Sequence, residues 1–102
     1  MGNIYKVYVG SEEPIYKTDY QEFVKIEEEF SGAVGWLTRY DGVGLWPAGG
    51  KVEREYSMVY EVISGGEIDA IVEHFAQSLG KFFEQEAVLV VVMKQACESR
   101  LV

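Results

Sequence analysis

The chain has 102 residues, of which 48% are hydrophobic and 25% are charged, a composition typical of a single globular domain. Its 17 acidic and 9 basic residues give a formal net charge of -8, which repels a phosphate backbone and argues against general DNA or RNA binding. With only one cysteine and one histidine, the chain predicts no internal disulfide, no metal site and no cofactor.

The start of the chain and its apolar runs bear on location. No run is long enough to cross a bilayer, and the first residues lack the basic and apolar regions of an export signal. We therefore expect a cytoplasmic protein without a membrane partner.

The first two elements are predicted to be a strand and a helix. A strand over 4–9 follows from alternating side chains and should end at Gly10. A helix over 19–30 follows from apolar residues at helical spacing, with Thr18 and Gln21 as a capping box. The pair Ser31-Gly32 should stop this helix.

Two further strands are predicted, with a hairpin between them. The first covers 33–40 and should turn at Asp41-Gly42, a dipeptide typical of tight turns. Several glycines and a proline then predict an irregular, protruding hairpin at about 41–53. A long strand is expected from Arg54 to Ile63.

The last two elements complete a βαββαβ order. Ser64 and Glu67 form a second capping box before an apolar stripe that ends at Phe82. A final strand is expected over 87–94. This order predicts a single ferredoxin-like α+β domain over 1–102, with a four-stranded antiparallel sheet and two helices on one of its faces.

The final strand predicts that the second sheet face is covered. Residues Val88 to Met93 are all apolar and do not alternate with polar ones, so they offer apolar side chains to both faces. A second copy of the chain is the simplest cover, and we expect a homodimer or a larger assembly. The alternative is that residues 43–52 fold back across the sheet.

One group of side chains indicates ligand binding. Flat rings stack on bases, and fixed cations pair with phosphate or other anions. Both kinds gather around the hairpin, and they predict a ligand site made of Trp36, Arg39, Tyr40, Trp46, Lys51, Arg54 and Tyr56. The ligand would be a small anionic or nucleotide-like molecule.

No comparable pattern indicates catalysis. His74 and Cys97 lack the companions that imidazole or thiol chemistry requires. Glu84 and Glu86 flank Gln85 at a predicted helix end, where solvation explains them. Gly42, Gly44 and the pair Gly49-Gly50 precede no helix that could receive a phosphate, and we interpret them as turn glycines.

Several short segments resemble a bacterial family of small proteins known only as a domain of unknown function. They are Val7-Tyr8-Val9-Gly10, Leu37-Thr38 with Asp41-Gly42 and Trp46, Arg54-Glu55-x-Ser57-x-Val59, and Gln85-Glu86-Ala87-Val88-Leu89. The resemblance implies a ferredoxin-like fold and supplies no established catalytic residues. Members often begin with an export segment, whereas this chain starts at its first strand, as a phage-type version of the family would.

Three functions fit these observations. The first is a non-catalytic oligomeric protein that binds a small ligand, such as a phage-type protein that sequesters a signalling nucleotide. The second is a small enzyme of the dimeric ferredoxin-like type. The third is an acidic inhibitor that binds another protein, in the manner of a nucleic-acid mimic.

Overall fold

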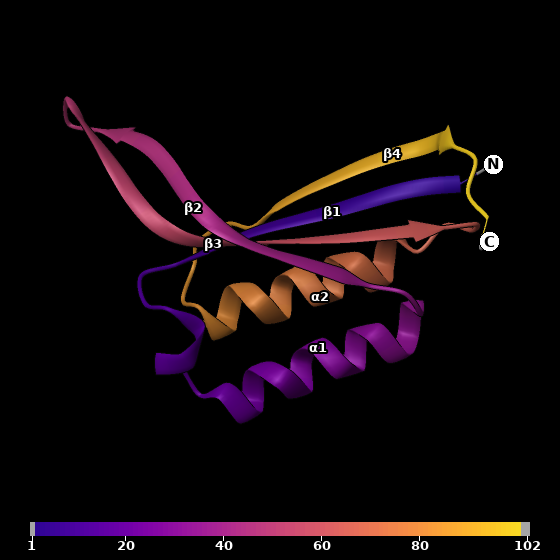
Figure 1. Ribbon diagram of the computed structural model, residues 1–102, viewed down its shortest axis with the longest axis horizontal. Coiled ribbons are helices and arrows are strands. Elements are labelled where there is room, and N and C mark those ends of the chain that lie inside the picture. The colour runs from indigo at the N-terminus through magenta and orange to yellow at the C-terminus, as the bar shows by residue number, and fades with distance from the viewer. Residues whose placement is uncertain (1, 101–102) are drawn as a thin grey trace.

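The computed structural model describes residues 2–100, so residue 1 and residues 101–102 of the predicted domain lie outside the described residues. Its elements are β1 (Gly2–Ser11), the short 3-10 helix η1 (Ile15–Lys17), α1 (Tyr20–Val34), β2 (Thr38–Ala48), β3 (Lys51–Ser64), α2 (Asp69–Phe82) and β4 (Leu89–Cys97). All sheet pairings are antiparallel, and the strand order is β2-β3-β1-β4 (Figure 1). This is the predicted ferredoxin-like α+β fold.

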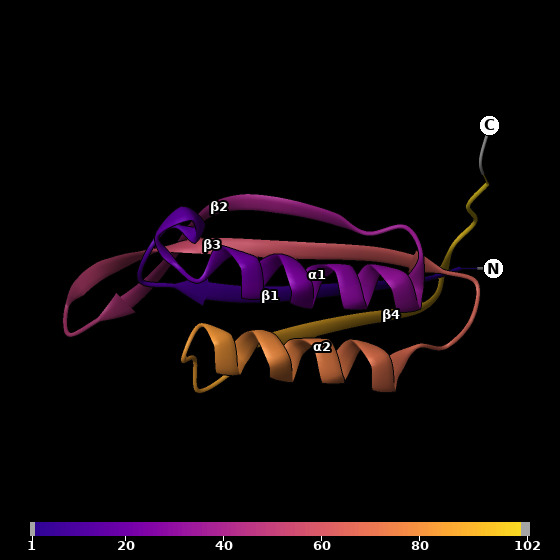
Figure 2. The same ribbon diagram turned by 90° about the horizontal axis from the view of Figure 1, so that it is seen from below.

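Both long helices cover the same face of the sheet, and the core lies between them and the strands (Figure 2). Tyr5, Val7 and Val9 point from β1 into this core, as their alternation predicts. Phe30 of α1 stacks on Phe75 of α2 with ring centroids 3.9 Å apart. We call the covered face the helix side and the other face the open side.

The first strand and helix are both longer than predicted. β1 continues through Gly10 to Ser11, and α1 continues through Ser31-Gly32 to Val34. Asp19, rather than Thr18, caps α1 by accepting a hydrogen bond from the Glu22 N–H at 3.3 Å. The helix ends at Gly35, whose φ of 88° favours glycine.

The observed bounds differ most from the predicted ones in the β2–β3 hairpin. Residues 33–34 are helical and β2 begins at Thr38. No turn forms at Asp41-Gly42, because β2 pairs with β3 without a break from Thr38↔Glu61 to Ala48↔Lys51. The turn lies at Gly49 and Gly50, with φ of 57° and 80°, which suit a two-residue hairpin turn.

The hairpin protrudes as predicted, but it is regular. Only β2 pairs with β3 beyond the Ser11↔Tyr56 pair, so residues 44–55 form a two-stranded ribbon, which we call the arm. The arm extends past the end of the other strands (Figure 1). The alternative that residues 43–52 fold back across the sheet is therefore wrong, and the arm leaves the open side uncovered.

The second helix and last strand agree with the prediction except at their ends. The Ser64 hydroxyl accepts a hydrogen bond from the Gly66 N–H at 3.2 Å and does not cap α2, which begins at Asp69 without a side-chain cap. Gly80 lies inside α2, and a Cβ at this position would lie 3.2 Å from Val88 Cγ2. The glycine therefore allows the segment before β4 to pack closely on the helix.

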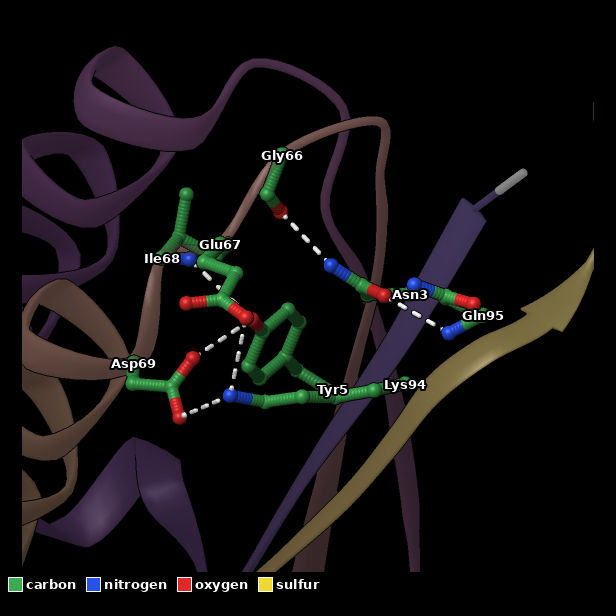
Figure 3. Close-up of polar contacts among 8 residues, drawn as sticks. All are labelled: Asn3, Tyr5, Gly66, Glu67, Ile68, Asp69, Lys94 and Gln95. Atoms are coloured by element: carbon green, nitrogen blue, oxygen red, sulfur yellow. Dashed lines mark hydrogen bonds and ion pairs between the residues drawn. The ribbon is translucent and has the colours of Figure 1, made fainter.

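A polar cluster joins β1, β4 and the start of α2 (Figure 3). The buried Tyr5 hydroxyl donates to Asp69 at 2.8 Å and accepts from the Ile68 N–H at 3.0 Å. Lys94 forms ion pairs with Asp69 and Glu67, each at 3.2 Å. These contacts hold the N-terminus of α2 against the sheet.

Asn3 extends the same cluster toward the end of β4. Its side-chain amide donates to the Gly66 carbonyl at 3.0 Å and accepts from the Gln95 N–H at 2.8 Å. Gln95 has a φ of 53°, a conformation that non-glycine residues rarely adopt. Within residues 2–100, no helix is long and apolar enough to span a membrane.

Candidate ligand site on the open side

Three glycines on neighbouring strands form a patch of bare backbone on the open side. Gly42 and Gly10 both pair with Ser57, one from β2 and the other from β1, and Gly44 pairs with Glu55 on β3. Directly paired residues point to the same face of a sheet. We call Gly10, Gly42 and Gly44 the glycine floor; Gly42 and Gly44 are strand residues, not the turn glycines that we predicted.

The carboxylate of Glu55 lies over Gly10. A Cβ added at Gly10 would clash with all three atoms of the Glu55 carboxyl group, and a Cβ at Gly44 would lie 3.5 Å from Glu55 Cγ. The side chain of Glu55 therefore occupies space that only glycine at position 10 leaves free. The carboxylate lies where the arm leaves the sheet.

The environment of Glu55 makes its carboxyl group a weaker acid than an ordinary glutamate. Partial burial raises the pKa of Glu55 above its ordinary value, and the negative charge of Glu12 raises the pKa further. Carboxyl groups with a raised pKa are common at binding and catalytic sites.

Glu12 also lines a polar cavity of about 360 Å³ next to this end of the sheet. The loop after β1 contributes Ser11, Glu12 and Glu13, and the loop after α2 contributes Glu84 and Gln85. Glu84 has a φ of 54°, so this loop includes a residue in the left-handed region. Glu12 therefore lines this cavity and also affects the pKa of Glu55.

Aromatic rings border the glycine floor on two sides. Tyr40 and Tyr8 both pair with Val59, which is the next residue of β3 after Ser57 that points to the open side. At the other end of the floor, Trp46 pairs with Glu53, the next such residue before Glu55. Tyr40 is 55% exposed and Trp46 is 40% exposed, so both rings are accessible. Lys51 lies farther along the same face, at the tip of the arm.

The structure places Arg39 away from this face. Arg39 lies on the helix side, where its guanidinium donates to both Glu27 oxygens at 2.8 and 2.9 Å and lies 5.2 Å from the Phe23 ring centroid. It also pairs with Asp41 at 3.0 Å. Burial disfavours the charge of Arg39, but the two carboxylates outweigh it and raise the pKa of its guanidinium.

The remaining predicted residues are also separate from the floor. Tyr56 and Arg54 alternate with Glu55 and lie on the helix side of β3, in line with the buried Met58 and Tyr60. Trp36 is 72% exposed and precedes β2 at the opposite end of that strand from the arm. The structure thus groups Tyr40, Trp46 and Lys51 on one face and separates Arg39, Arg54, Tyr56 and Trp36 from them.

The sequence-based candidate site did not include Glu55, Ser57 or Gly10. The resemblance to the uncharacterised family includes Val9-Gly10 and Arg54-Glu55-x-Ser57, which was the one available signal. Their proximity follows from the β1–β3 register, which no local pattern contains.

The rest of the open side is mainly apolar. Ile4, Tyr8, Val59, Ile63, Leu89, Val91 and Met93 share this face by register. Leu89 is 60% exposed and Ile63 is 46% exposed, while a Lys6–Glu61 ion pair at 3.5 Å lies among them. The final strand therefore exposes apolar side chains, as its lack of alternation predicts.

Metal chemistry has no obvious location in the described part of the chain. Residues 2–100 contain no group of three or more histidine, cysteine or acidic side chains that could hold an ion. His74 lies on the exposed surface of α2, where its carbonyl accepts a hydrogen bond from Ser78 at 3.0 Å.

The fold resembles several solved structures. A phage SAM lyase in its apo state has a TM-score of 0.66 and 20% sequence identity, covering 90% of this chain and 79% of that one. The periplasmic divalent cation tolerance protein CutA from Archaeoglobus fulgidus has a TM-score of 0.60 and 8% identity, covering 98% and 89%. At these identities the likeness establishes the fold alone.

The phage lyase has also been solved in complex with S-methyl-5'-thioadenosine, and that structure matches with a TM-score of 0.52 and 20% identity over 90% of this chain and 80% of that one. No family model matches this chain. No curated protein matches it either. The resemblance to the uncharacterised bacterial family therefore stays a prediction.

Proposed function

We propose that this protein self-associates and binds a nucleoside that carries a positive charge, of the S-adenosylmethionine type, on the glycine floor. The observation that carries the proposal is the Glu55 carboxylate, which lies over Gly10; in the strand register Glu55 lies between the partners of Tyr40 and Trp46. The base would lie over Gly42, where a Cβ would meet nothing within 4 Å, and the cationic group would lie next to Glu55.

The chemistry of the floor supports such a ligand. Glycines let a flat ring approach the backbone closely, and a neighbouring aromatic ring contributes about 1–3 kcal/mol per stacked base. An ionised Glu55 would form a charge-assisted contact with a sulfonium or ammonium group. A bound cation would lower the pKa of Glu55 and favour its ionised form.

Similarity to the phage lyase supports the same ligand class. Its sequence identity of 20% exceeds the 8% of the archaeal CutA, although both structures share the fold. The complex with S-methyl-5'-thioadenosine indicates that one protein of this fold accepts a nucleoside.

The proposed charge differs from the sequence-based expectation. We expected an anionic or nucleotide-like ligand because Arg39, Lys51 and Arg54 lie near one another in the sequence. Arg39 is held by Glu27 and Asp41, and Arg54 lies on the other face of the ribbon. A carboxylate, together with the net charge of -8, instead favours a cation.

Calorimetry with four ligands tests the proposal: S-adenosylmethionine, S-methyl-5'-thioadenosine, adenosine and AMP. We expect Glu55→Gln to weaken S-adenosylmethionine binding by about tenfold or more and to leave the uncharged thioether almost unaffected. Trp46→Ala should weaken both. Glu28→Gln removes the same charge from the exposed surface of α1 and is the matched control. Equal affinities for Glu55→Gln and Glu28→Gln would contradict the proposal.

Self-association is part of the same proposal. Among residues 2–100 of one chain nothing covers the apolar residues of the open side, and a second copy would remove them from water. An assembly would also enclose the glycine floor, which strengthens the contact between Glu55 and a cation.

Catalysis is the second candidate function, and the raised pKa of Glu55 favours it. Incubation with S-adenosylmethionine, followed by chromatography of the nucleosides, separates the two candidates. Recovery of unchanged ligand from a binding protein indicates capture, whereas formation of S-methyl-5'-thioadenosine that Glu55→Gln abolishes indicates a lyase. The acidic-inhibitor function and the cytoplasmic location stay predictions.

A further inference from the structure

The helix side of the arm and of the strand pair at its base has apolar side chains and one cation, Arg54, that no other described residue covers. Val43, Leu45 and Val52 are 63%, 57% and 64% exposed, and Tyr56 is 47% exposed. They lie on one face of the ribbon with Arg54, because they alternate with the residues of the open side. Among residues 2–100, the ion pairs include neither Arg54 nor Lys51.

A groove with complementary properties lies at the far edge of the sheet. It has a volume of about 380 Å³ between α2 and β4, and Ala76, Gly80, Val88 and Val90 supply an apolar base. Glu73 and Glu86 lie at its rim, together with Lys81. Neither glutamate belongs to an ion pair in the described part of the chain.

The arm and the groove cannot meet within one molecule. The strand order β2-β3-β1-β4 places them at opposite edges of the sheet, and the arm extends away past the end of the other strands (Figure 1). The outer edge of β4, beside the groove, has no pairing partner among the described residues. An unpaired edge with an adjacent apolar groove is suited to receive an extended segment.

We propose that the arm of one copy docks its helix side into the α2–β4 groove of a second copy, so that the chains associate head to tail. The exposed leucine and valines of the arm would fill the apolar groove. Arg54 of the arm would lie near the two rim glutamates, so the charges are complementary. Such a contact uses a different surface on each partner, and repeated rotation closes it into a ring.

If the contact is head to tail, variants with different defective surfaces should complement each other, which a symmetric contact would not allow. Leu45→Asp places a charge on the arm and leaves the groove of the same copy intact. Gln77→Arg places a long cation at the exposed wall of the groove and leaves the arm intact. Each variant alone should lose the head-to-tail contact and sediment as a smaller species than the wild type, since every such contact would include one defective surface, while the contact through the open side stays intact.

The mixture of the two variants is the decisive measurement. An equimolar mixture should form a larger species than either variant alone, because the intact arm of the Gln77→Arg chain can occupy the intact groove of the Leu45→Asp chain. Tyr16→Asp introduces the same charge at a residue that is 77% exposed on η1, and this control should assemble as the wild type does. Circular dichroism establishes that each variant is folded.

Three outcomes would overturn the inference: a monomeric wild type, wild-type assembly by either variant, or a mixture that is no larger than either variant alone. The last outcome would indicate that arms meet arms in a symmetric contact. The experiment contains no ligand, so its result is independent of whether the glycine floor binds a nucleoside.

Discussion

The carboxyl group of Glu55 on β3 occupies the space next to the Cα of Gly10 on β1 that a side chain at position 10 would need. Gly10 has an ordinary strand conformation, so the glycine is not required for its backbone angles. Glycine matters at this position because it leaves space for the side chain of Glu55. Position 10 therefore controls where the Glu55 carboxylate lies.

Gly10→Ala tests this relationship. The new methyl group should displace the flexible end of Glu55 without unfolding the strand, and S-adenosylmethionine affinity should fall by about tenfold, as for Glu55→Gln. Gly32→Ala is the matched control, because a Cβ there has nothing within 4 Å and should stabilise α1 by up to about 1 kcal/mol. Unchanged affinity in a folded Gly10→Ala protein would contradict the proposed position of the ligand.

Two neighbouring valines of β4 should respond differently to the same substitution. Val91 faces the open side with Lys6, so Val91→Lys should give a folded protein that loses the open-side contact and sediments as a smaller species than the wild type. Val90 packs against the core on the helix side, so Val90→Lys should destabilise the fold by about 2 kcal/mol or more. Sedimentation and urea denaturation measure the two effects; a Val91→Lys protein that sediments as the wild type does would show that the open side is not an interface.

Tyr5→Phe should weaken the attachment of α2 to the sheet. The substitution keeps the buried ring but leaves the Ile68 N–H without its acceptor and Asp69 without its donor. We expect a loss of about 1–3 kcal/mol in unfolding free energy. Hydrogen exchange at the start of α2 should accelerate more than exchange at its end.

The stability that Asp69 contributes should be lost at acid pH. Its hydrogen bond from Tyr5, followed by its contact with Lys94, lowers the pKa of Asp69 below 3.8. The contribution is complete above the unfolded-state pKa and is lost as the pH falls through the lower folded-state pKa. The difference in unfolding free energy between wild type and Asp69→Asn should therefore be constant near neutral pH and shrink below about pH 4. A difference that is still constant at pH 2 would contradict this assignment.

Arg39→Ala should affect the fold rather than ligand binding. The substitution removes the partner of Glu27, and we expect a loss of about 1–2 kcal/mol in stability, since both side chains are only partly shielded from water. Calorimetry on the folded variant should give wild-type affinity for S-adenosylmethionine. A large loss of affinity would return Arg39 to the candidate site.

The order of elements could be predicted because it depends on local patterns. The alternation in β1 and the apolar stripe of α2 are both visible in short windows of sequence. The hairpin turn was misplaced because Asp41-Gly42 and Gly49-Gly50 give similar local signals. Only the strand register distinguishes them: Gly42 faces Ser57 in the sheet, whereas Gly49 and Gly50 have positive φ.

The candidate site could be predicted only in part, for the same physical reason. The prediction grouped Tyr40 and Trp46 by their closeness in the sequence; the structure puts both rings on one face of β2, since their numbers differ by an even amount. The ion pair of Arg39 with Glu27 could not be predicted, because Glu27 lies on a helix. Glu55 gains its importance from Gly10, which lies on a different strand.

The unbroken pairing between β2 and β3 limits how the arm can change in length. Deletion of one opposed pair at its base, such as Gly44 with Glu55, would turn every later side chain to the opposite face. Deletion of two successive pairs would preserve the faces and shorten the arm by about 7 Å. Natural or engineered length variants that keep both surfaces should therefore differ by multiples of four residues, divided equally between the two strands.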